Sequence, residues 1–166
     1  LSAADQTRLA ASLIQFQQQH GPQLQVLVIP QLDDETIESY SIKVVEKWQL
    51  GSEEKDDGVL LLVAKDDRKM RIEVGQGLEG DLTDVLAGRI IRAGIAPFFK
   101  QGQFGEGIVM GLRMIAESVG GTLDNVPVSR TRNTRQSSGS GLGFILFLIF
   151  FLIAPALSGR RRGGVG

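Results

Sequence analysis

The sequence predicts an α/β fold with a small mixed sheet, followed by one membrane-spanning helix. Three observations lead to this prediction: a strand, a helix and a second strand follow one another, the second strand continues into a hairpin, and a long apolar run stands near the C-terminus. The 166 residues are enough for one domain with a core and a tail. We expect a globular domain over 1–124, a flexible basic Ser/Gly linker over 125–141, a transmembrane helix over 142–158 and a basic Gly-rich tail over 159–166.

The first half of the chain reads as a βαβ unit preceded by a helix. Ser2 and Asp5 form a capping-box pattern, and His20-Gly21-Pro22 ends the first helix. The first strand, 24–29, is ended by Pro30. A second helix follows, capped by Asp33 or Asp34 and ended by Gly51, with one apolar face formed by Ile37, Tyr40, Ser41, Val44, Val45 and Trp48. Such a crossover makes the two flanking strands parallel.

The hairpin is the most informative stretch of the sequence. Residues 59–64 form a continuous apolar run, typical of a central strand covered on both faces, and 70–74 alternate between apolar and charged residues. A turn centred on Asp66 and Asp67 places Asp57 opposite Gln76. We therefore expect the acidic residues at 56–57 to meet the glycine-rich loop at 75–81 at the open end of the hairpin.

Two more helices follow the hairpin. Thr83 and Asp84 precede apolar residues at helical spacing, which predicts a third helix from about 83 to 95, closed by Pro97. A fourth helix directs Ile108, Leu112, Ile115 and Val119 inward and ends at Gly120-Gly121. Gly107 and Gly111 are spaced for the close approach of another helix, or for tight packing on the sheet.

The charge distribution excludes some classes of partner and indicates a membrane. Residues 1–124 hold 12 basic and 19 acidic residues, a net charge of −7, so nucleic-acid binding is not expected. Residues 125–166 hold six basic residues and no acid, on both sides of the apolar run. We interpret this run as a transmembrane helix rather than a core helix. Arg160–Arg162 then place the C-terminus in the cytoplasm, although Arg130, Arg132 and Arg135 weaken that inference.

The residues at the open end of the hairpin suit two kinds of chemistry. There are no cysteines and only one histidine, His20, so zinc and His-dependent triads are improbable. Clustered carboxylates favour a hard cation, Ca²⁺ or Mg²⁺, with the candidate ligands Asp57, Glu79, Asp81 and Asp84. With a bound metal, Asp57 and Asp84 are candidate catalytic groups of a phosphatase, and Arg71 or Arg89 could hold a phosphoryl oxygen. The alternative is that these acids are solvated surface residues and helix caps.

A third hypothesis rests on the glycines. Residues 75–80 have the pattern GxGxxG, which in dinucleotide-binding proteins cradles a pyrophosphate. Here the pattern follows the second strand of a hairpin instead of opening a βαβ unit. Moreover, Asp57, Glu79 and Asp81 would repel a phosphate in the absence of a cation.

These motifs resemble the TPM domain found in YgcG-like bacterial membrane proteins. The similarity lies in 57–63, 67–80, Asp84 and 88–91, with further matches at the N-terminus, at 48–51 and at 99–104. It covers about residues 1–121, and the membrane span with its Gly-rich tail is also similar to YgcG-like proteins. Asp57, Glu79 and Asp84 match acidic positions of the family, Arg71 matches its arginine, and Gln76 replaces the aromatic residue usual there.

The resemblance implies a three-layer α/β sandwich with helices on both faces of a small sheet. It also implies a signal peptide that has been removed and a domain outside the cytoplasm, which in bacteria is the periplasmic side of the cell membrane. The family includes a thylakoid-lumen protein of photosystem II repair, with attributed acid phosphatase activity and calcium binding, and an auxiliary subunit of a neurotransmitter receptor. We therefore expect either a cation-binding module with another membrane or envelope protein as partner, in assembly or quality control, or a metal-assisted acid phosphatase acting on phosphomonoesters.

Overall fold

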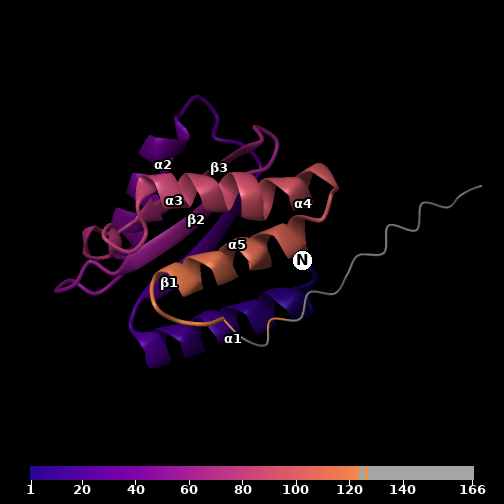
Figure 1. The fold of residues 1–166 in the computed structure, drawn as a ribbon. Coiled ribbons are helices and arrows are strands. Elements are labelled where there is room, and N and C mark those ends of the chain that lie inside the picture. The colour runs from indigo at the N-terminus through magenta and orange to yellow at the C-terminus, as the bar shows by residue number, and fades with distance from the viewer. Residues whose placement is uncertain (124–125, 127–166) are drawn as a thin grey trace, which may run out of the picture. The chain divides into compact units, whose positions relative to one another are not determined.

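A computed structural model describes residues 1–123 and 126 (Figure 1). Contacts divide the chain into Leu1–Thr131 and Arg132–Gly166, and the described residues all belong to the first unit. Their elements, in chain order, are α1 Ala3–His20, β1 Gln23–Ile29, α2 Ile37–Trp48, β2 Gly58–Ala64, β3 Lys69–Val74, the 3-10 turn η1 Gln76–Leu78, α3 Asp84–Arg89, the π-helical segment η2 Ile90–Ile95, α4 Ala96–Lys100 and α5 Phe104–Ser118.

The sheet has the strand order β1-β2-β3 and is mixed, as the sequence predicts. β1 pairs with β2 in parallel, joined by the crossover helix α2, and β2 pairs with β3 as an antiparallel hairpin. Every residue of the central strand β2 is buried. Val59 lies opposite Val74, and this register continues outward to Gly58 and Gly75, whose N–H donates to the Gly58 carbonyl at 2.8 Å. The predicted meeting with the glycine-rich loop is therefore confirmed for Asp56, whose carbonyl accepts the Gly77 N–H at 3.1 Å.

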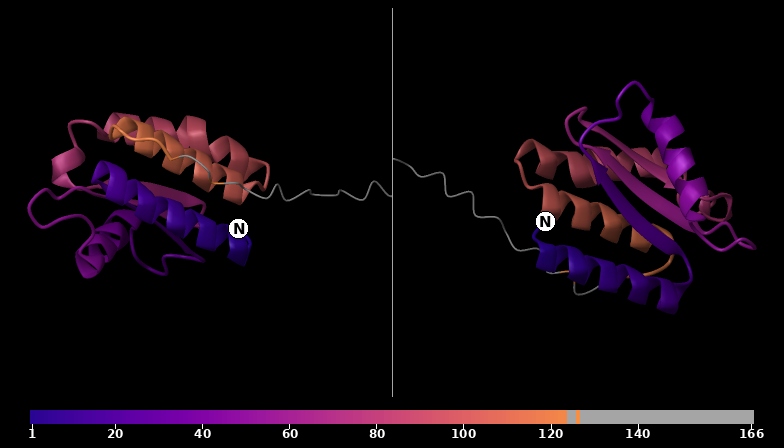
Figure 2. Two further views of the ribbon diagram at one scale, coloured as in Figure 1. Left: turned by 90° about the horizontal axis from the view of Figure 1, so that it is seen from below. Right: turned by 180° about the vertical axis from the view of Figure 1, so that it is seen from behind.

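Helices cover both faces of the sheet (Figure 2). On one face Leu60 and Leu62 pack against α2. On the other face Leu61 belongs to a larger core with residues of α1, η2 and α5, including Phe16, Ile90 and Ile115. The alternation of a β-strand sends neighbouring side chains of β2 into these two cores, so the α/β architecture with two helical layers is confirmed.

Two details of α2 differ from the sequence prediction. Its N-cap is Thr36, whose hydroxyl accepts the Ser39 N–H at 3.2 Å. Asp33 instead has a left-handed backbone with φ of 51° and accepts a hydrogen bond from Gln31, so it lies too early in the turn to cap. Trp48, expected on the apolar face, is 45% exposed because the helix ends there.

The third helix is longer than predicted. Pro97 does not close it, because α3 passes through the π-helical segment η2 into α4, which ends at Lys100. Pro97 stands in the first turn of α4, where its missing N–H is tolerated. A Cβ on Gly111 would lie 2.5 Å from the Ile95 side chain, and one on Gly107 would lie 2.8 Å from Phe99. The expected close approach of another helix is thus confirmed, and that helix is η2–α4.

The predicted C-terminal segments are outside the described part of the chain. They comprise the linker, apart from Val126, the membrane span at 142–158 and the tail at 159–166. Among residues 1–123 and 126, no helix is both long and apolar enough to cross a bilayer.

Candidate functional site

Asp56 holds the glycine-rich loop at the open end of the hairpin. Its carboxylate accepts the Gln76 N–H at 2.8 Å, and its carbonyl accepts the Gly77 N–H at 3.1 Å. A Cβ on Gly75 would lie 2.8 Å from the Asp56 carboxylate, and one on Gly77 would overlap the Lys55 carbonyl. The glycines are therefore required because the backbone at 55–56 packs directly against the loop. The N–H groups of Gln76 and Gly77 are bonded to Asp56, and Lys55 and Asp56 fill the space where a Cβ would lie. This arrangement argues against a pyrophosphate cradle.

Asp57 is turned into the structure rather than toward the loop. The residue is 8% exposed, and its Oδ1 accepts hydrogen bonds from the Ser52 N–H at 2.8 Å and the Ser52 hydroxyl at 3.0 Å. Burial acts to raise the pKa of Asp57, but these hydrogen bonds outweigh burial and the pKa is lowered. The side chain therefore stays ionised and holds the 52–57 loop against the sheet.

A polar cavity beside the loop runs along β3, and we call it the β3 groove. It has a volume of about 490 Å³ and lies between β3 and the segment leading into α3. Its charged lining residues are Arg71, Glu73, Glu79 and Asp84, and Thr83 adds a hydroxyl. Three acids against one arginine give the lining a net charge of −2.

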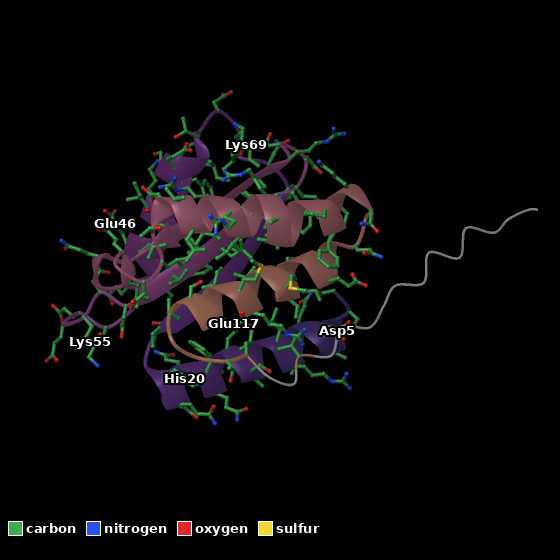
Figure 3. The ribbon with its side chains drawn as sticks, in the orientation of Figure 1. Asp5, His20, Glu46, Lys55, Lys69 and Glu117 are labelled. Atoms are coloured by element: carbon green, nitrogen blue, oxygen red, sulfur yellow. The ribbon has the colours of Figure 1, made fainter. Side chains whose placement is uncertain are left out.

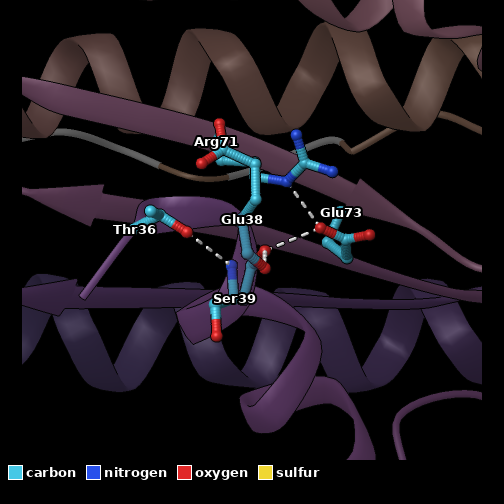
Figure 4. A network of polar contacts seen from close by, with 6 residues as sticks. Thr36, Glu38, Ser39, Arg71 and Glu73 are labelled. Carbon is cyan, nitrogen blue, oxygen red and sulfur yellow. Dashed lines mark hydrogen bonds and ion pairs between the residues drawn. The ribbon is translucent and has the colours of Figure 1, made fainter.

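A polar network fixes the arginine of the groove (Figure 4). The Nε of Arg71 donates to Glu73 at 2.6 Å, and the hydroxyl of the fully buried Ser41 on α2 lies 2.6 Å from the same carboxylate oxygen. The bond to Glu73 and the charges of Glu73, Glu38 and Asp84 raise the pKa of Arg71, outweighing desolvation. Arg71 is thus a permanent cation, held through Nε, with its two terminal nitrogens outside that pair.

The structure brings together three of the five residues singled out from the sequence. Arg71, Glu79 and Asp84 line one cavity, whereas Asp57 and Asp81 do not. Within residues 1–123 and 126, no three His, Asp or Glu side chains converge closely enough to form a ready metal-binding group. Glu79 and Asp84 are the carboxylates of the groove that are outside the Arg71–Glu73 pair, so they are the pair available to a cation.

Glu73 and Ser41 were missed as parts of the site, although the sequence carries a signal for each. Arg71 and Glu73 are two residues apart on a strand, so they point to the same face. Ser41 was placed on the inward face of α2 among apolar residues, and a buried hydroxyl needs a polar partner. Its partners are the Glu38 carbonyl at 2.9 Å, within α2, and the Glu73 carboxylate at 2.6 Å, across on β3.

These features define an α/β domain with one βαβ unit, one hairpin and an acidic groove along its edge strand. The TPM domain family model matches residues 1–118, and the chain belongs to this family. No curated protein matches the chain.

Three solved structures share the fold. The N-terminal domain of a protein from P. gingivalis is 33% identical, with 71% of this chain and 74% of that chain covered and a TM-score of 0.62. The BA42 protein of the psychrophilic bacterium Bizionia argentinensis is 18% identical, with 78% and 90% covered and a TM-score of 0.59. The N-terminal domain of the cg2496 protein from Corynebacterium glutamicum is 16% identical, with 72% and 71% covered and a TM-score of 0.51.

The P. gingivalis structure is of an isolated N-terminal domain. In the present chain, both core clusters lie within the unit Leu1–Thr131. Residues 1–131, which contain both core clusters, are therefore the piece used in the experiments below.

Proposed function

We propose that this chain is a membrane-tethered extracytoplasmic binding module whose β3 groove takes a divalent cation and presents it to a protein partner. The observation that carries the proposal is the placement of Glu79 and Asp84 in one cavity of net charge −2. Their oxygens are hard ligands, and the groove lining has no sulfur or imidazole that would favour a transition metal.

Two carboxylates leave the coordination of a cation incomplete. Ca²⁺ takes about six to eight oxygen ligands, whereas Mg²⁺ is commonly held by one or two carboxylates, with water or a substrate oxygen completing its shell. The groove thus suits Mg²⁺ better than Ca²⁺ when the domain is alone. An oxygen supplied by a partner would complete the shell, which links cation binding to partner capture. The apolar run at 142–158 and Arg160–Arg162 support a membrane tether and a partner in the cell envelope.

The test is a titration of residues 1–131 with Mg²⁺ and with Ca²⁺, followed through the backbone amide NMR signals of 79–85. We expect saturable shifts that are lost in Glu79→Gln and in Asp84→Asn. The matched control is Asp81→Asn, because Asp81 is an exposed acid of the same segment that does not line the groove. Equal shifts in all three variants would show that the cation is attracted only by the general negative charge.

A metal-assisted phosphatase is the second candidate, and Arg71 favours it. The guanidinium is held by Glu73 through Nε, so its terminal nitrogens are positioned to bind a phosphoryl oxygen beside a cation on Glu79 and Asp84. Hydrolysis of p-nitrophenyl phosphate that requires Mg²⁺ and is abolished by Asp84→Asn but not by Asp81→Asn would establish the enzyme. Metal binding without hydrolysis would rule out the phosphatase and favour the cation-binding module.

A further inference from the structure

A second cavity lies at the opposite end of the hairpin from Asp57, and we call it the turn pocket. It has a volume of about 760 Å³ and is bounded by the β2–β3 turn, α4 and the start of α5. This volume is within the usual range for sites that enclose a small organic molecule. The turn pocket shares no lining residue with the β3 groove.

The rim of the turn pocket is strongly cationic on a domain that is otherwise acidic. It carries four basic side chains and one acid, a net charge of +3, from Lys65, Asp66, Arg68, Lys69 and Lys100. Among the described residues, ion pairs join Lys43 to Glu35 and Arg71 to Glu73. None of the four basic side chains of the rim takes part in either pair. The rim therefore concentrates unneutralised positive charge, which attracts an anion.

The backbone of the turn keeps these cations together. The Lys65 N–H donates to the Ile29 carbonyl at 3.0 Å, and the Asp66 N–H donates to the Pro30 carbonyl at 2.8 Å, so the turn is tied to the end of β1. The second acid of the turn, Asp67, does not line the pocket, because its carboxylate accepts the Leu32 N–H at 2.7 Å. The turn thus presents its basic residues to the pocket while one of its acids is occupied elsewhere.

The floor of the turn pocket is apolar and aromatic. Phe99 and Phe104 meet edge to face with ring centroids 4.9 Å apart, and Met70 lies beside them in the lining. Phe104 is 38% exposed. Lys65 and Phe104 also line a neighbouring cavity of about 590 Å³ between α1 and β1, whose lining is mostly apolar and includes the 49% exposed Val28. An apolar body longer than a single ring could therefore continue from one cavity into the next.

We propose that the turn pocket binds an amphiphilic anion, with a phosphate or carboxylate head at the lysines and an acyl or aromatic body over Phe99 and Phe104. Positive charge alone would take inorganic phosphate, and an apolar floor alone would take a neutral chain, but the combination selects a molecule that carries both parts. Such a molecule can be a free single-chain amphiphile or the head and chain of a membrane lipid. The two sources share the chemistry that the pocket recognises.

The probe is octyl phosphate, used with residues 1–131 as a monomeric ligand and followed by calorimetry and amide NMR. The pocket variant is Lys65→Gln/Lys69→Gln, and the matched control is Lys47→Gln/Lys55→Gln, which removes the same charge from exposed lysines that do not line the pocket. Figure 3 shows Lys55 and Lys69 far apart on the domain. All four side chains are on the surface, so both variants are expected to fold.

We expect the pocket variant to bind octyl phosphate about tenfold more weakly than the control does, because two neighbouring positive charges are lost. Octanol binding should be unchanged by the pocket variant, and octyltrimethylammonium and inorganic phosphate should bind far more weakly than octyl phosphate. A second arm compares sedimentation with phosphatidylglycerol and phosphatidylcholine vesicles, and binding confined to the anionic vesicles would identify a lipid source. Equal affinity of the two lysine variants for octyl phosphate and for anionic vesicles, or equal affinity for octyl phosphate and inorganic phosphate, would overturn the proposal.

Discussion

Replacing Gly77 by alanine tests whether the glycine-rich loop is required by packing. The new Cβ would overlap the Lys55 carbonyl oxygen and lie 3.0 Å from its carbonyl carbon and 3.2 Å from the Asp56 carbonyl oxygen. These are backbone atoms, so no side-chain rotation relieves the overlap. Overpacking costs about 1–3 kcal/mol, and weakening the two hydrogen bonds between Asp56 and the loop adds about 1 kcal/mol, which gives a loss of about 2–4 kcal/mol.

The assay is urea unfolding of residues 1–131 followed by far-ultraviolet circular dichroism, with a thermal scan beside it. For a domain of this size the expected loss lowers Tm by roughly 10 °C. Gly80→Ala is the matched control, because a Cβ there meets no atom within 4 Å and its change in stability should stay within about 0.5 kcal/mol.

Equal unfolding midpoints for Gly77→Ala and Gly80→Ala would refute the packing explanation. Such a result would mean that the loop can move away from Lys55 without loss of unfolding free energy. Ligand binding would then be the better explanation for the glycines. A large loss in Gly77→Ala together with unchanged cation binding in the folded fraction would separate the role of this loop from that of the β3 groove.

Two further predictions concern single side chains. The pKa of Asp57 is lower in the folded protein than its ordinary value of 3.8, so its hydrogen bonds stabilise the folded state at any pH above 3.8. This stabilisation is lost as the pH falls through the pKa that Asp57 has in the folded protein. Wild type should therefore lose more unfolding free energy than Asp57→Asn in urea titrations between neutral and strongly acidic pH, and parallel pH curves would contradict this. Thr36→Ala should lower the free energy of unfolding by about 1 kcal/mol, because the N-cap of α2 is lost, whereas Asp34→Ala should change it little. A larger loss in Asp34→Ala than in Thr36→Ala, in the same unfolding assay, would show that Asp34 is the cap.

The strand pairing could be predicted because the sequence patterns that specify it are local. The apolar run of β2, the polar turn at 65–68 and the alternation of β3 fix the hairpin, and a hairpin fixes which residues meet at its open end. This is why Asp56 and the loop at 75–77 were placed together correctly. The cap of α2 was harder, because three acids and a threonine stand between Leu32 and Ile37, and only the backbone angles decide among them.

The direction of each acidic side chain could not be read from strand pairing. Asp56 and Asp57 are neighbours at the same sheet end, yet one bonds to the loop and the other to Ser52. Asp56 has a left-handed backbone with φ of 47°, which turns the chain between the two residues. Both carboxylates are thus engaged by nearby N–H groups, a local competition that spacing alone does not resolve.

Of the acids at 79–84, Glu79 and Asp84 line the β3 groove and Asp81 does not. The buried leucines of this segment are a sequence signal for that difference. Leu78 and Leu82 are both buried, and the Leu82 N–H donates to the Leu78 carbonyl at 2.8 Å, so the chain makes one tight turn between two anchors. A turn closed in this way cannot point all of its acids the same way. Glu79 lines the β3 groove while Asp81 does not, and Asp84 reaches the groove as the first residue of α3. The spacing of buried leucines, rather than the count of acids, is therefore the better guide to which carboxylates in such a loop can share a ligand.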